Sequence, residues 1–142
     1  MPSGASAAQR EAERLASLTF FLDHQIGRYQ VAQALRATGA RVEVHLDHFV
    51  GDMPDVDWIP RVAAKQWVLI TKDQHIRRNP LEVASYRASK LRGFVATGKD
   101  MTAQELGELL VHCLPGMVRR AAGRPGPLLF TISRGGTFTK LI

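Results

Sequence analysis

The sequence has a single cysteine, Cys113, among its 142 residues. One cysteine excludes an intramolecular disulfide and a cysteine-based zinc site, and it is typical of a reducing, cytosolic setting. No apolar run approaches the roughly 18–20 residues needed to cross a membrane. The first 18 residues also lack the basic start and apolar core of a secretory signal. We therefore expect a cytoplasmic protein with no membrane partner.

Acidic residues are scarce relative to basic ones. Lysine and arginine total 19 against 13 acids, which gives a net charge of +6 and a sequence pI of about 10.1. A basic balance favours a polyanionic partner such as nucleic acid, although many small basic domains are simply soluble. The length suits one domain, and a hydrophobic fraction of 45% is enough to form a core.

Apolar runs alternate with segments of helical periodicity along most of the chain. The expected strands are 18–22, 41–46, 67–71, 92–97 and 127–133, and the expected helices are 26–39, 55–66, 80–91 and 102–123. This order predicts an α/β fold, a three-layer α/β/α sandwich with a mainly parallel, five-stranded sheet. Residues 1–18 are expected to form an N-terminal extension, in which 11–18 form a short helix or simply lead into the first strand, followed by one domain over 19–142. The final "GGTFTKLI" favours a hairpin return across Gly135 and Gly136.

Acids occur where strands of this sheet would end. Asp23 follows the run "TFFL", and Asp73 follows "WVLITK". Asp55 and Asp57 begin the helix that leads into the third strand. Because the carboxyl ends of parallel strands meet at one edge, we expect these carboxylates to converge. Hard oxygen ligands of this kind suit Mg²⁺ or Mn²⁺, so the pattern predicts a metal site.

A structural explanation exists for each acid taken alone. Aspartate is a common turn residue after a strand, and an acid at a helix start is a common cap. Three chain segments that deliver acids to one edge favour the functional interpretation. The residues around Asp73 support it, because Lys72, His75, Arg77 and Arg78 could bind the phosphates of a substrate.

The amino-acid sequence of these segments resembles that of a known family. The stretches "FFLDHQIGR…VAQALRATGARVEVH" and "PDVDWIP…WVLITKD" are similar to compact PIN-like domains, including VapC-type toxins, and the resemblance covers roughly residues 19–133. The resemblance implies a PIN-like fold and a ribonuclease activity that depends on Mg²⁺ or Mn²⁺. Carried over, Asp23 matches the first-strand acid, Asp55 the acid that opens the middle helix with Asp57 as a nearby substitute, and Asp73 the acid after the third strand. Asp23, Asp55 and Asp73 would hold the metal.

The leading hypothesis is a divalent-metal-dependent ribonuclease that hydrolyses RNA phosphodiester bonds. The resemblance implies the toxin of a type II toxin–antitoxin pair, with an antitoxin protein that covers the acidic edge, and it leaves room for a homodimer. The alternative is a catalytically impaired scaffold that binds RNA or a protein partner, because His75 stands where many relatives carry another acid. A phosphoacceptor receiver domain is disfavoured, because no acid pair precedes a strand-end aspartate in the expected order.

Overall fold

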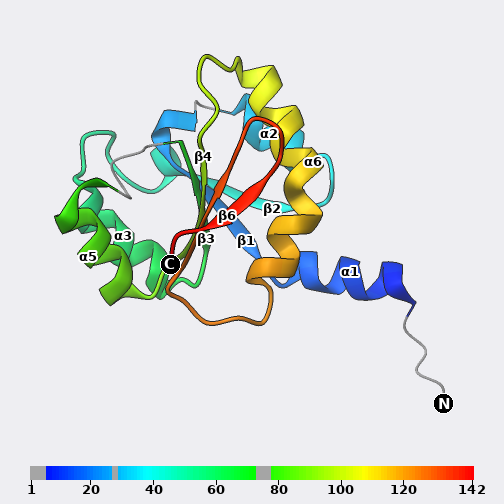
Figure 1. Ribbon diagram of the computed structural model, residues 1–142, viewed down its shortest axis with the longest axis horizontal. Coiled ribbons are helices and arrows are strands. Elements are labelled where there is room, and N and C mark those ends of the chain that lie inside the picture. Colours follow the sequence, from blue (N-terminus) through cyan, green and yellow to red (C-terminus); the bar gives the residue numbers. More distant parts are fainter. Residues whose placement is uncertain (1–5, 27–28, 73–77) are drawn as a thin grey trace.

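The computed structural model describes residues 6–26, 29–72 and 78–142. Its centre is a sheet with helices on both sides (Figure 1). The strands are β1 (Thr19–Leu22), β2 (Arg41–Val44), β3 (Val68–Thr71), β4 (Arg92–Ala96), β5 (Leu128–Ile132) and β6 (Phe138–Lys140). The described helices are α1 (Ala7–Ala16), α2 (Gln30–Arg36), α3 (Asp55–Ala64), α5 (Pro80–Ser89) and α6 (Ala103–Ala121), with short 3-10 turns η1 (His24–Ile26) and η2 (His45–Asp47).

The sheet has the order β2-β1-β3-β4-β5-β6, and β1 to β5 run parallel. The register aligns Leu22 of β1 with Val44 of β2 on one side and with Ile70 of β3 on the other. The three strands therefore end at nearly the same level. Residues that follow them come together at the carboxyl edge of the sheet.

Each face of the sheet carries its own apolar core, because successive side chains of a strand point to opposite faces. Phe20 and Leu22 pack on the face that α2 and α6 cover, whereas Phe21 packs on the face that α3 and α5 cover. Figure 1 shows these two helix layers on either side of the strands. The predicted α/β/α sandwich is confirmed.

The strand count differs from the five that the sequence predicted. The sheet has six strands, because the C-terminal hairpin returns along β5 as the antiparallel β6. Gly136 takes a φ of +86°, a region that suits glycine, and its amide donates to the Ser133 carbonyl oxygen at 2.9 Å. The Ser133 amide then donates to the Thr137 carbonyl oxygen, which closes the turn. The hairpin was expected, but its return strand joins the sheet.

Helix α1 begins at Ala7, four residues before the expected start. Ser6 caps it by accepting from the Gln9 amide, while the Gln9 side chain accepts from the Ser6 amide. The helix lies against α6, where Leu15 and Val118 line a shared cavity. Among the residues described, no helix is both long enough and apolar enough to span a membrane.

Candidate metal-binding site

Strand β1 delivers Asp23 to the carboxyl edge of the sheet and buries it there. The Asp23 amide still donates to the Ile70 carbonyl oxygen of β3 at 3.0 Å, so the backbone is fixed beyond the last strand residue. The Thr71 hydroxyl donates to Asp23 Oδ2 at 2.7 Å. Only 1% of Asp23 is exposed. The carboxylate is thus held in one orientation by β3, with its second oxygen free of that bond.

His45 reaches Asp23 through the register of the sheet. Because Leu22 of β1 pairs with Val44 of β2, the residues that follow these partners, Asp23 and His45, lie at the same level. His24, the first residue of η1, adds a third side chain. The two imidazole rings lie with their centroids 5.0 Å apart. Two neighbouring strands therefore bring one carboxylate and two imidazoles to one place.

Among the described residues, these three side chains form a group whose metal-ligating atoms lie close enough to share one ion. One ligand atom from each of Asp23, His24 and His45 lies within 4.8 Å of the others. The His24 Nδ1 atom lies 2.8 Å from Asp23 Oδ1, but the two atoms do not meet with hydrogen-bond geometry. Both atoms therefore keep bonding capacity that the described protein atoms do not use. We call Asp23, His24 and His45 the edge triad.

His45 is the most unusual member of the edge triad. It is fully buried, and neither ring nitrogen has a hydrogen-bond partner among the described residues. Phe49 and Trp58 contact the ring in edge-on arrangements, with centroids at 5.5 and 5.4 Å. Burial lowers the pKa of His45; Asp23 opposes this shift and His24 adds to it. The imidazole is therefore neutral at neutral pH, which is the form that binds a metal.

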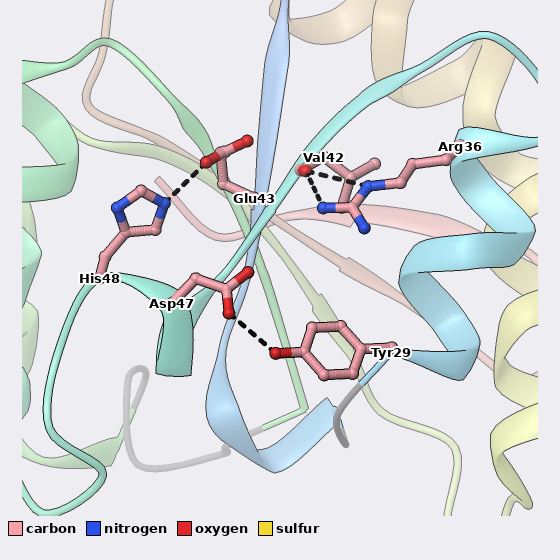
Figure 2. A network of polar contacts seen from close by, with 6 residues as sticks. All are labelled: Tyr29, Arg36, Val42, Glu43, Asp47 and His48. Carbon is pink, nitrogen blue, oxygen red and sulfur yellow. Dashed lines mark hydrogen bonds and ion pairs between the residues drawn. The ribbon is translucent and has the colours of Figure 1, made fainter.

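A polar network holds the turn that carries His45 (Figure 2). The Tyr29 hydroxyl donates to Asp47 Oδ1 at 2.8 Å, which ties the start of α2 to η2. His48 Nε2 lies 2.7 Å from Glu43 Oε1, which ties the end of η2 back to β2. Both contacts flank His45 along the chain. The network therefore fixes the backbone that places the His45 ring beside Asp23.

The two acids at the start of α3 are not members of the edge triad. Asp55 Oδ1 accepts a hydrogen bond from Trp58 Nε1 at 2.9 Å. Trp58 in turn packs edge-on against His45. Asp57 lies exposed in the first turn of α3. Asp55 thus touches the site through an indole ring, as a residue that positions Trp58.

The remaining predicted residues fall on the segment after β3. Asp73, His75 and Arg77 lie outside the described residues. Lys72 and Arg78 bracket that segment and line a cavity of about 530 Å³ at the carboxyl ends of β3 and β4. Lys99 lines the same cavity, together with Asp100. The described part of this edge therefore pairs the buried edge triad with a basic cavity.

The edge triad has the donor set of a metal site with open positions. One carboxylate and two neutral imidazoles suit Mn²⁺, Zn²⁺ and other transition metals, and three protein ligands leave room for water or substrate. Mg²⁺ prefers oxygen ligands and retains several waters. The side chains present fit a divalent ion, and Mn²⁺ fits them better than Mg²⁺ does.

Fold and edge triad together define an α/β domain with a candidate metal site at the carboxyl edge of a parallel sheet. The chain belongs to the PIN-like domain family: the family model described as "PIN like domain" matches residues 18–98. The family resemblance inferred from the sequence is confirmed.

A curated relative extends the match beyond the family model. The chain is 30% identical over 116 residues to a protein named "Putative ribonuclease VapC45" from Mycobacterium tuberculosis (strain ATCC 25618 / H37Rv). The alignment covers 79% of this chain and 83% of that protein. No solved structure shows a significant match to the chain.

Sequence reasoning singled out the acids and gave little weight to His24 and His45. A lone histidine is more often a surface or core residue than a ligand, and periodicity alone gives no pairing register. The useful signal was the strand pattern itself. If β1 and β2 end together, the residue after "RVEV" must lie beside the residue after "TFFL".

Proposed function

We propose that the protein is a divalent-metal-dependent ribonuclease that hydrolyses RNA phosphodiester bonds. One observation supports this most strongly: the buried edge triad stands at the carboxyl edge of a PIN-like fold, with hydrogen-bonding capacity that described protein atoms leave unused. The similarity to a protein named as a ribonuclease points the same way.

The chemistry supplied by a divalent ion bound here is a water of lowered pKa and neutralisation of charge on the phosphoryl group. The chain itself supplies orientation. Thr71 holds one oxygen of Asp23, so that the other faces His24. Burial keeps His45 neutral. Lys72 and Arg78 line the neighbouring cavity, where they would bind the phosphates on either side of the scissile bond.

We also propose a cofactor and partners for the protein. The ion would be Mg²⁺ or Mn²⁺, of which Mn²⁺ is the better fit to the donors of Asp23, His24 and His45, and Asp73 is the acid expected to complete the set from the segment outside the described residues. Asp55 acts on the site through Trp58. The protein acts in the cytoplasm as the toxin of a type II pair, an antitoxin protein covers the carboxyl edge, and assembly as a homodimer belongs to the same proposal.

A cleavage assay with matched variants tests the proposal. A mixed RNA pool is incubated with the full chain in Mn²⁺, in Mg²⁺ and in chelator. Asp23→Asn keeps the shape and the bond from Thr71 but removes the charge, so we expect cleavage to fall at least about 100-fold. Asp52→Asn, an exposed acid in the loop before α3, is the control and should cleave normally.

A second candidate function is RNA binding without hydrolysis. The observation that favours it is the shortage of carboxylates: in the described residues Asp23 is the one acid in the edge triad, while Asp55 is bonded to Trp58. RNA binding that chelator does not change, with no cleavage by the wild type in either ion, would replace the nuclease proposal with this one.

A further inference from the structure

The buried His45 ring requires an explanation that the surrounding protein does not give. Both of its nitrogens are buried and without a hydrogen-bond partner among the described residues, and the ring is 0% exposed. Leaving a buried polar group without a hydrogen-bond partner is unfavourable, because the group has given up its bonds to water. A fold that places such a group beside a carboxylate either accepts that cost or satisfies the group with a ligand.

The neighbours of His45 restrict where such a ligand can bind. Phe21, Phe49 and Trp58 pack around the ring with centroid distances of 5.9, 5.5 and 5.4 Å, and they offer it aromatic carbon. Trp58 Nε1 is already bonded to Asp55. Among the described residues, Asp23 and His24 each offer one ligand atom within 4.8 Å of a ring nitrogen of His45. A ligand shared by these three side chains must therefore coordinate both imidazole nitrogen and carboxylate oxygen.

The spacing of the edge triad suits a single ion. Donor atoms bound at about 2.0–2.2 Å to one ion lie at most about 4.4 Å apart. The three donor atoms here lie within 4.8 Å of one another, so small side-chain rotations close the difference. Two of the donors are already in contact, since His24 Nδ1 and Asp23 Oδ1 lie 2.8 Å apart. Those atoms lack hydrogen-bond geometry, which leaves both available to an ion.

The donor types select among divalent ions. Imidazole nitrogen is a good ligand for zinc, iron, nickel and copper, whereas Mg²⁺ takes oxygen and gives up its water reluctantly. Among first-row divalent ions, affinity at such sites rises from manganese to copper and falls again at zinc, which still binds more tightly than manganese. A site with two imidazoles and one carboxylate should therefore discriminate strongly against Mg²⁺.

We propose that Asp23, His24 and His45 form an ion site that prefers transition metals, with Zn²⁺ bound more tightly than Mn²⁺ and both far more tightly than Mg²⁺. This inference rests on the proposed function, because it names the ion class of the same site. It differs from a site built from carboxylates alone, in which Mg²⁺ would compete well. The two histidines set the selectivity, and Asp23 supplies the negative charge.

Calorimetric titration of the metal-free full chain tests the preference. ZnCl₂, MnCl₂ and MgCl₂ are added in separate experiments, and we expect Zn²⁺ to bind at least about 100-fold more tightly than Mg²⁺. His45→Gln and His24→Gln should each weaken Zn²⁺ binding at least about tenfold. His112→Gln, an exposed histidine on α6, is the matched control and should bind as the wild type does. If His45→Gln does not fold, His24→Gln, at a half-buried position, carries the same test.

A spectroscopic readout locates the ion. With ¹⁵N-labelled histidine, Zn²⁺ should shift the ring nitrogens of His24 and His45 and leave those of His112 unchanged. Equal affinities for Zn²⁺ and Mg²⁺, or Zn²⁺ affinity that neither the His24 nor the His45 variant changes, would overturn the inference. Mg²⁺-supported RNA cleavage that persists in His45→Gln would leave the ribonuclease proposal intact. Selective Zn²⁺ binding without RNA cleavage in any ion would support the ion site and contradict the ribonuclease proposal.

Discussion

Two polar clusters in this molecule, each with a buried aromatic side chain, differ in whether protein groups satisfy their hydrogen bonds. Tyr86 of α5 is 0% exposed, and its hydroxyl donates to the Leu128 carbonyl oxygen at 2.6 Å. Arg92, at the start of β4, donates to the carbonyl oxygens of Ala121 and Gln66 at 2.7 and 2.8 Å. The edge triad is equally buried at its centre, yet the His45 nitrogens have no partner among the described residues.

A glycine beside Tyr86 leaves room for the hydrogen bond from its hydroxyl to the Leu128 carbonyl oxygen. A Cβ atom at Gly93 would lie 2.5 Å from the Tyr86 hydroxyl oxygen, so glycine leaves the space that the hydroxyl occupies. Burial raises the pKa of Tyr86 well above its usual value, and Arg92 opposes this. The phenol therefore stays protonated as a donor at neutral pH. Tyr86 and Arg92 are thus satisfied by protein groups, whereas the edge triad has buried polar atoms that a ligand could satisfy.

Tyr86→Phe should give the largest change in stability. Removing the hydroxyl takes the donor from a buried carbonyl, so we expect a loss of about 1–3 kcal/mol in the free energy of unfolding. Urea denaturation measures it. RNA cleavage per folded molecule should stay at the wild-type level, because the Tyr86 hydroxyl bonds to Leu128 at the start of β5, at the opposite edge of the sheet from the edge triad. A loss of activity without loss of stability would break the comparison.

His45→Leu should move stability in the opposite direction. Leucine fills the apolar surroundings and removes the unpaired nitrogens, so we expect the metal-free protein to gain about 1 kcal/mol or to remain unchanged. The same denaturation experiment in chelator measures this, with His112→Gln as the control. RNA cleavage should be lost. Destabilisation as large as that of Tyr86→Phe would show that His45 is a structural residue.

Tyr29→Phe should have the smallest effect of the three variants, a slight loss of ion affinity at the edge triad. Its exposed hydroxyl bond to Asp47 is worth about 0.5 kcal/mol, which corresponds to about a twofold change in ion affinity if the whole bond serves to place His45. Calorimetry with Zn²⁺ measures the change. An affinity loss of the size expected for His24→Gln would mean that the network of Figure 2 does more than hold η2.

Much of the fold was predictable because the strands are short and apolar. "TFFL" and "VLIT" are buried on both faces, as parallel strands between helix layers must be, and the sequence shows this directly. The sixth strand was missed because a Gly-Gly hairpin predicts a turn but does not say whether its return strand pairs with the sheet.

The site was harder to predict because side-chain partners depend on local choices. Asp55 was expected to be a ligand, yet in the helix its carboxylate meets Trp58 three residues later, a spacing that favours side-chain contact on one face. The sequence did not single out His45, since only the β1–β2 register places it beside Asp23. All of the roles assigned from the sequence stay predictions, namely the catalytic and metal-binding roles of Asp23, Asp55, Asp57 and Asp73 and the substrate-binding roles of Lys72, His75, Arg77 and Arg78.

Manganese binding to the wild type and to Asp23→Asn tests the central claim most directly. The electron paramagnetic resonance signal of free Mn²⁺ reports how much ion the metal-free protein takes up. We expect the wild type to bind Mn²⁺ and Asp23→Asn to lose at least about tenfold in affinity, while Asp52→Asn binds normally. Equal uptake by all three proteins would contradict the claim that Asp23 belongs to an ion site.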